Sequence, residues 1–302
     1  MRALVVDHSV PGRLALATVP DPVPGPDDVL VEVAAVSLNF GELPKNDGDA
    51  STGPVPGWDA AGVVKRAAAS GEGPQPGDRV VTWGWNGGWA ELRAVPVGEL
   101  AVLPDEVEFP QAAALPVAGL TALRALRRAG VRPGHRVAIT GASGGVGRFA
   151  VQLAHLAGAE VHALVGSPER GEGLTELGAA SVITSPADLG APVDILLDNV
   201  GGPLLAELLG HIAEGGTAVT IGAASGEPTA LDPYRLVANR VTLTGFLESG
   251  DSAADLAYLA RLVADGRLSA SVDRVESWKK IGETAVALLE RRIRGKAVLT
   301  ID

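Results

Sequence analysis

The chain has 302 residues, and its 25 basic and 36 acidic side chains give a formal net charge of −11. An acidic chain without a basic cluster lacks the positive surface that nucleic acids and anionic membranes attract, so we expect neither as a partner. The chain contains no cysteine, which excludes disulfides, thiolate nucleophiles and cysteine-ligated metals. We expect a cytoplasmic protein, because there is no secretory signal pattern and no apolar run approaches the ~20 residues of a membrane helix.

The first hundred residues predict a β-rich domain. Short apolar segments alternate with turns rich in glycine and proline, which is typical of a small barrel or sandwich. The expected strands are residues 1–7, 29–36, 62–67 and 79–83.

After Pro110 the periodicity changes to alternating helices and strands, which predicts a parallel sheet. The expected helices of this middle part are residues 111–129, 145–157 and 171–177. Its expected strands are residues 136–140, 160–165, 181–184, 193–198, 217–221 and 241–243. In the tail we expect helices at 253–264 and 281–292 and strands at 270–275 and 296–300, and we expect this tail to pack back onto the first domain.

A glycine-rich turn joins the strand at 136–140 to the helix that follows it. Glycines at this place let the backbone approach a pyrophosphate at the helix N-terminus, although a tight turn without a ligand has the same pattern. With the alternation that follows, the turn predicts dinucleotide binding by Gly141, Ser143, Gly144, Gly145, Val146 and Gly147.

The end of the next strand indicates which dinucleotide is bound. An acidic residue there would favour NAD, whereas this chain has Ser167 and Arg170, which can bond the 2′-phosphate of NADPH. Glu169 lies between them, and a helix cap and a solvated arginine are the alternative reading. We therefore expect NADPH.

Several motifs resemble those of one enzyme family, in the same order along nearly the whole chain. They are Ser37-Leu-Asn-Phe40, Pro56-Gly-Trp-Asp-Ala-Ala-Gly-Val63, Gly77-Asp-Arg-Val80, Gly87-Gly-Trp-Ala-Glu91, Leu115-Pro-Val-Ala-Gly-Leu-Thr-Ala122, the glycine turn, Asp198-Asn-Val-Gly-Gly202 and Gly295-Lys-Ala-Val298. The chain resembles the medium-chain dehydrogenase/reductase superfamily, in its zinc-free, quinone-oxidoreductase-like branch.

The resemblance implies an α/β protein with two domains. A GroES-like, β-rich catalytic domain would comprise residues 1–110 and 247–302, and a Rossmann domain with a doubly wound parallel sheet residues 111–246. It also implies a homodimer joined at the edge of the Rossmann sheet, through the strands at 217–221 and 241–243.

The resemblance further implies that the site holds no metal. Asn39, Trp58 and Val117 stand where zinc-dependent relatives have ligands, and they are not a zinc ligand set. The histidines are scattered without metal-ligand spacing, at His8, His135, His155, His162 and His211.

By resemblance, Asn39 and Thr121 lie beside the nicotinamide and are the expected catalytic residues. Asn199 and Phe246 are expected at the cofactor, Asn199 because it follows a strand end and Phe246 through its backbone. A turn-stabilising asparagine, a threonine bonded to its own helix and a core phenylalanine are the alternatives.

Two further features concern the substrate. Thioester-reducing relatives carry a tyrosine soon after the asparagine motif, but here residues 41–48 contain none. Glu42, Lys45 or water could supply the proton, although we expect both side chains to be exposed to solvent. Four of the five tryptophans lie between Trp58 and Trp89, which indicates either a pocket for a flat substrate or packing within the barrel.

The sequence thus predicts an NADPH-dependent, metal-free reductase that transfers hydride to a quinone or a conjugated carbonyl. A reductase of enoyl thioesters or of biosynthetic intermediates is an alternative within the enzyme class. A non-catalytic NADPH-binding sensor is the alternative outside it.

Overall fold

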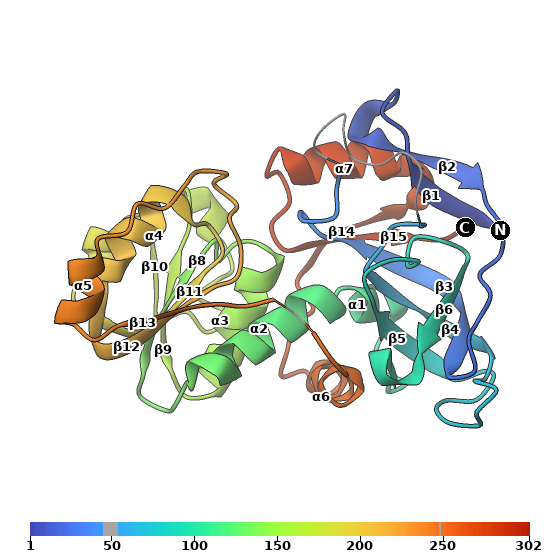
Figure 1. Cartoon of the computed structure of the whole chain (residues 1–302), viewed down its shortest axis with the longest axis horizontal. Helices are drawn as coiled ribbons and strands as arrows, with labels where there is room; N and C mark the ends of the chain where they lie inside the picture. Colours follow the sequence, from blue (N-terminus) through green and yellow to red (C-terminus); the bar gives the residue numbers. More distant parts are fainter. Residues whose placement is uncertain (45–53, 248) are drawn as a thin grey trace. The chain divides into compact units, whose positions relative to one another are not determined.

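The computed structural model describes residues 1–44, 54–247 and 249–302 and divides into two compact units (Figure 1). One unit consists of Met1–Leu120 with Gly250–Asp302, and the other of Thr121–Ser249. The sequence placed these boundaries after residues 110 and 246, where the pattern of secondary structure changes. In the structure the first boundary falls inside a helix, α2 (Pro116–Ala129).

The unit of residues 121–249 is built on a parallel sheet. Its strands are β8 (Arg136–Thr140), β9 (Glu160–Leu164), β10 (Ser181–Ile183), β11 (Val193–Asp198), β12 (Ile212–Thr220) and β13 (Thr242–Gly245). Their order across the sheet is β10-β9-β8-β11-β12-β13, and every pairing is parallel. This doubly wound order confirms the predicted class, and it places the reversal of strand order between β8 and β11.

Apolar strands and amphipathic helices form the core of this unit. Most residues of β8 and β11 are buried, as expected of parallel strands covered on both faces. The helices are α2, α3 (Gly145–Leu156), α4 (Gly202–Leu208) and α5 (Pro233–Ala238), of which α3 packs on β8 and β9. Leu205 and Leu208 of α4 pack with Ala138 and Leu196 of the sheet.

Two expectations for the helices are wrong. Residues 171–177 form turns after a short 3-10 helix at Pro168–Gly171, because Gly173 adopts a positive φ of 77° that a helix does not allow. The expected helix at 111–129 is two helices, α1 (Phe109–Ala113) and α2, because Pro116 has no N–H and disfavours a helical residue before it. The helices α4 and α5 were not predicted.

The other unit is a mainly antiparallel β structure. Its strands are β1 (Arg2–Val6), β2 (Leu14–Thr18), β3 (Asp28–Leu38), β4 (Asp59–Arg66), β5 (Arg79–Trp83), β6 (Leu92–Pro96), β7 (Leu100–Val102), β14 (Val272–Ser277) and β15 (Lys296–Thr300). Within the described residues, β1 and β2 form a hairpin, and a seven-stranded sheet has the order β14-β15-β3-β4-β5-β7, with β6 also paired to β3. The sequence predicted neither β2 nor β6 nor β7.

The tail completes this unit, as the sequence predicted. The strand β15 pairs antiparallel with β3, and α6 (Ala253–Ala264) and α7 (Ile281–Leu289) pack on β7 and β2. The register opposes Ser37 to Asp59 and Leu38 to Ala297. The end of β3 and the beginnings of β4 and β15 therefore meet at one edge of the sheet. Among the described residues, no helix combines the length and apolar character needed to span a membrane.

Candidate active site

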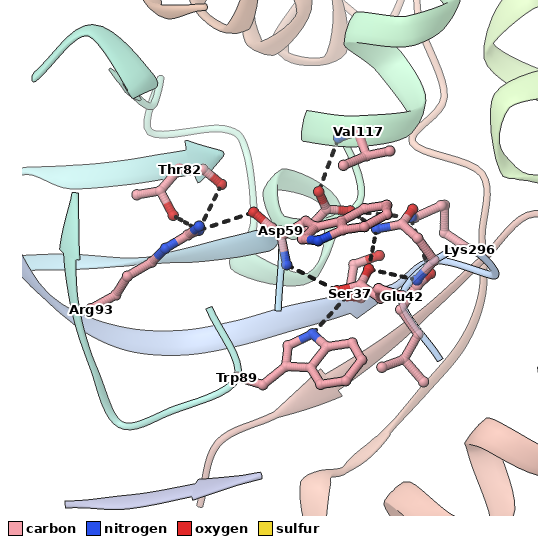
Figure 2. A network of polar contacts seen from close by, with 11 residues as sticks. Ser37, Glu42, Asp59, Thr82, Trp89, Arg93, Val117 and Lys296 are labelled. Carbon is pink, nitrogen blue, oxygen red and sulfur yellow. Dashed lines mark hydrogen bonds and ion pairs between the residues drawn. The ribbon is translucent and has the colours of Figure 1, made fainter. Parts of the chain in front are cut away.

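A cluster of polar side chains lies at this edge of the β-rich unit (Figure 2). Asn39 directly follows β3, Glu42 lies one turn later, Asp59 begins β4 and Lys296 begins β15. These four residues come from three distant parts of the sequence, and the strand pairing alone brings them together.

Asn39 connects the other three side chains of the cluster. Its amide nitrogen Nδ2 donates to Glu42 Oε2 at 2.6 Å and to Asp59 Oδ2 at 2.8 Å. Its Oδ1 accepts a hydrogen bond from the ammonium of Lys296 at 2.6 Å. Both ends of the amide are thus occupied, which fixes the orientation of the Asn39 side chain.

Asp59 and Lys296 form a buried ion pair. Asp59 is fully buried and Lys296 is 2 % exposed, and Lys296 Nζ lies 3.2 Å from Asp59 Oδ2. Asp59 Oδ1 also accepts the backbone N–H of Val117 at 2.9 Å, in the first turn of α2. The positive end of that helix adds to the stabilisation of the carboxylate.

Glu42 is half-buried, contrary to the expectation that it is exposed. Its Oε2 accepts from the backbone N–H and the amide of Asn39, and its Oε1 accepts from the backbone N–H of Trp58 at 2.9 Å. Burial and the nearby charge of Asp59 raise the pKa of Glu42 to about 8, although these hydrogen bonds and Lys296 act in the opposite direction. The other candidate proton donor, Lys45, lies outside the described residues.

Arg93 of β6 binds the backbone next to the cluster. Its guanidinium is almost fully buried and donates to the carbonyl oxygens of Trp58 at 3.1 Å, Gly84 at 3.1 Å and Asn86 at 3.0 Å. It also donates to Thr82 Oγ1 at 2.8 Å. One buried side chain therefore holds the backbone at Trp58 and the loop after β5 in fixed positions.

The structure separates the four neighbouring tryptophans into two kinds. Trp83 and Trp89 are buried and belong to the packing of the unit. Trp58 is half-buried and Trp85 is 48 % exposed. Their rings pack edge to face, with 5.3 Å between the ring centroids. Both readings of the tryptophans thus apply, each to a different pair, and the Trp58–Trp85 pair offers apolar ring surface next to Glu42.

The glycine turn of the other unit leaves the N-terminus of α3 free of side chains. Gly144 is the N-cap of α3 and has no side chain to block the helix N-terminus. A Cβ on Gly147 would lie 2.4 Å from the carbonyl oxygen of Gly141, so no larger residue fits there. Gly141 itself has a positive φ of 59°. The remaining residues expected here, Ser143, Gly145 and Val146, belong to the same turn and the first turn of α3.

A buried polar contact connects β8 and β11 where the strand order reverses. Thr140 Oγ1 donates to Asp198 Oδ1 at 2.7 Å and accepts the backbone N–H of Asn199 at 2.9 Å. Asn199 Nδ2 donates to the carbonyl oxygen of Thr140 at 2.8 Å. Burial raises the pKa of Asp198. The contact places Asn199 beside the glycine turn, at the crevice where ligands of such sheets bind.

The two residues expected to select NADPH have different partners. Arg170 Nε donates to Ser143 Oγ at 3.1 Å, so the structure brings Arg170 to the glycine turn. Ser167 instead bonds to Glu169, and this hydrogen bond lowers the pKa of the Glu169 carboxyl. The support for a phosphate contact is therefore stronger for Arg170 than for Ser167.

The remaining predicted residues are placed as follows. Thr121 is buried on α2 and belongs to the unit of residues 121–249, whereas Asn39 belongs to the other unit. Phe246 is half-buried, and its backbone N–H donates to the carbonyl oxygen of Thr220 at 2.9 Å. That N–H is thus used within the sheet.

No role was predicted for Asp59, Arg93, Lys296 or Thr140. A signal was available for the first three, because each is a charged residue next to a run of small or apolar strand residues. Such residues are rarely buried unless they are paired.

The comparisons with known proteins cover most of the chain. Residues 25–105 match the family model for the alcohol dehydrogenase GroES-like domain, and residues 145–265 match the model for zinc-binding dehydrogenases. The chain is 30 % identical to a probable zinc-binding oxidoreductase of Arthroderma benhamiae over 98 % of this chain and 96 % of that protein. It is 29 % identical to the quinone oxidoreductase of Mus musculus, over 81 % of this chain and 79 % of that protein. It is also 37 % identical to the acrylyl-CoA reductase of Ruegeria pomeroyi, but over only 60 % of this chain and 61 % of that protein.

Solved structures with the same fold cover the whole chain. The quinone oxidoreductase of Coxiella burnetii superimposes with a TM-score of 0.88 at 26 % identity, over 100 % of this chain and 99 % of that one. An NAD-dependent alcohol dehydrogenase superimposes with a TM-score of 0.90 at 29 % identity, over 100 % of both chains. A mycobacterial protein in complex with NADPH has a TM-score of 0.84 at 26 % identity, over 99 % of both chains.

The polar cluster does not fit the zinc ion that one of these family models implies. Zinc in proteins takes cysteine, histidine and carboxylate ligands, whereas Asn39, Trp58 and Val117 stand at the expected ligand positions. The oxygens of Asp59 already accept hydrogen bonds from Val117, Asn39 and Lys296, and the ammonium of Lys296 repels a second cation. Among the described residues, no group of three or more histidine, aspartate or glutamate side chains could hold a metal ion.

Proposed function

Because the chain belongs to the medium-chain dehydrogenase/reductase superfamily and is an oxidoreductase, we propose that it is an NADPH-dependent, metal-free reductase of quinones or conjugated carbonyls. The observation that carries this proposal is the buried ion pair of Asp59 and Lys296, because its ammonium already neutralises Asp59 and disfavours a metal cation there. Without a Lewis acid, a simple alcohol or ketone is a poor substrate. A conjugated acceptor spreads the added charge onto an oxygen that hydrogen bonds can stabilise.

The glycine turn fits the cofactor of this family. The backbone N–H groups at the start of α3 would bind its diphosphate, and Asn199 would border it where β11 ends. Asn39 and Thr121 would orient the nicotinamide. When bound, reduced nicotinamide supplies the hydride, and the residues of this chain position it and exclude water.

The preference for NADPH depends on Arg170. We expect Arg170→Ala to weaken NADPH binding by about 1.5–3 kcal/mol, because a charge-assisted hydrogen bond to the 2′-phosphate is lost. NADH binding should not change, since NADH has no such phosphate. Calorimetric titration of both nucleotides measures this. An equal loss of affinity for NADH would instead assign Arg170 to the glycine turn alone, through its hydrogen bond to Ser143.

The Trp58–Trp85 pair, of which Trp85 is exposed and Trp58 half-buried, supports a flat acceptor such as a quinone or an aromatic enone. A second candidate is an enoyl thioester, which the 37 % identity to an acrylyl-CoA reductase favours.

We also propose a homodimer joined at the edge strand β13, near which Tyr234 and Val237 of α5 are exposed. The cytoplasmic location remains an expectation from the sequence.

One assay compares these candidates. We expect NADPH oxidation with 9,10-phenanthrenequinone or a simple enone, at a rate that a chelator does not change. Faster turnover with an enoyl thioester would select the second candidate. Tight NADPH binding without turnover on any of these acceptors would favour a sensor.

A further inference from the structure

The four polar groups at the end of β3 do not balance in charge when both carboxyls are ionised. Asp59 and Glu42 would carry two negative charges, and both receive hydrogen bonds from the same amide of Asn39. Lys296 supplies one positive charge, and its ammonium contacts Asp59 and Asn39. One carboxyl is therefore in excess, and it is the one without an ammonium in contact.

The other charged group near Glu42 does not remove this excess. Arg93 of β6 faces the cluster, but its guanidinium donates to the backbone at Trp58, Gly84 and Asn86 and to Thr82. Its charge interacts with Asp59, with Glu99, which lies before β7, and with Glu42, so the positive charges of Arg93 and Lys296 face three carboxyls. Among the described residues, the charged groups that face Glu42 are thus Asp59 from β4, Lys296 from β15 and Arg93 from β6.

Glu42 is also placed next to the surface proposed for the substrate. Its Oε1 accepts from the backbone N–H of Trp58, and a Cβ on Gly41 would lie 3.2 Å from the ring of Trp58. Trp58 is half-buried and forms the exposed aromatic pair with Trp85. The carboxyl of Glu42 therefore lies beside the backbone of Trp58, the residue whose ring would bind a flat acceptor.

We propose that Glu42 is the catalytic acid of this site and delivers the proton that completes the reduction. This inference rests on the proposed function. Hydride from the reduced nicotinamide forms a C–H bond at the β-carbon of the enone, and the electron pair moves to the carbonyl oxygen. The O–H bond of Glu42 then breaks, its proton passes to the resulting enolate, and water returns a proton to the carboxylate.

The burial that retains this proton at neutral pH predicts a pH dependence. The pKa of Glu42 is raised to about 8, so the acid is available below pH 8 and is lost above it. The pKa of Glu42 is thus higher in the folded protein, at about 8, than its ordinary value of 4.5, which applies to the unfolded chain. Its contribution to the stability of the fold is therefore complete below pH 4.5 and is lost as the pH rises through about 8.

The test compares Glu42→Gln with the wild type and with Glu99→Gln. Glu99 is a matched control, because burial also raises the pKa of its carboxyl but no hydrogen bond joins it to Asn39 or Trp58 in the structure described. We expect Glu42→Gln to lower kcat for an enone by ~100-fold and to abolish the fall in activity above pH 8. Glu99→Gln should retain the wild-type kcat and the fall in activity above pH 8. A tetrahalogenated quinone, whose reduced form is far more acidic than an enol and is stable as its anion, should be reduced by Glu42→Gln almost as fast as by the wild type.

A second readout does not depend on turnover. In the cofactor-free protein, infrared difference spectroscopy should show a protonated carboxyl band at pH 7 that Glu42→Gln removes. Unchanged enone rates and an unchanged pH profile in Glu42→Gln would overturn the role of Glu42 while the proposed function stands. If the wild type oxidises NADPH with none of these acceptors, both the role of Glu42 and the proposed function are overturned.

Discussion

Gly144→Asp should strongly weaken NADPH binding without unfolding the protein. Gly144 is the N-cap of α3, with φ −83° and ψ 178°, which an aspartate readily adopts. Aspartate is a favourable N-cap, so helix α3 should be at least as stable as before. The same carboxylate would face the diphosphate of the cofactor, and repulsion of a few kcal/mol corresponds to a loss of affinity on the order of 100-fold.

Gly144→Asn is the matched control, because asparagine caps a helix equally well and carries no charge. The nearest atom to a Cβ at this position is the carbonyl oxygen of Gly141 at 3.3 Å, so either side chain needs a small local adjustment. Calorimetric titration with NADPH and thermal unfolding of both variants separate the two effects. NADPH binding by Gly144→Asp as tight as that of Gly144→Asn would show that the diphosphate binds elsewhere.

Lys296→Met should have the largest effect on stability. Removing the ammonium leaves the fully buried carboxylate of Asp59 without its counter-charge, and breaking such a pair costs about 3–5 kcal/mol. It also removes the hydrogen bond that orients Asn39, so activity should fall even in molecules that remain folded. Urea unfolding measures the free energy of unfolding directly.

The control for this prediction is the double variant Lys296→Met with Asp59→Asn. Removing both charges should recover most of the lost stability, because no uncompensated carboxylate remains at Asp59. Equal instability of the single and double variants would mean that Lys296 acts through packing rather than through its charge. A Lys296→Met protein with wild-type stability would contradict the buried pair itself.

The parts of the fold that local sequence determines could be predicted. The alternation of apolar strands and helices after Pro110 predicted the parallel sheet, and the glycine turn predicted the change from β8 to α3. The split at Pro116 and the turns after Gly171 were missed because helical periodicity continues through both segments. The short strands β6 and β7 were missed because their pairing with β3 and β5 depends on distant residues.

The candidate site was harder to predict, because its geometry depends on the pairing of distant strands. Glu42 lies in a polar segment and was expected in solvent, yet its carboxyl accepts the backbone N–H of Trp58, 16 positions away, and interacts with the charge of Asp59 at the start of β4. Lys296 reaches Asp59 across 237 positions of the chain. The four tryptophans look alike in the sequence, and only the fold separates the buried Trp83 and Trp89 from the exposed Trp85.

The most direct test of metal-free hydride transfer is to follow deuterium from the nicotinamide into the product. Chelator-treated protein would be incubated with an enone and NADPH deuterated at the transferable position of C4, and the product would be examined by mass spectrometry and NMR. We expect one deuterium at the β-carbon of the saturated ketone, with no metal added. Oxidation of NADPH with the label absent from the product, or turnover that requires added zinc, would contradict metal-free hydride transfer.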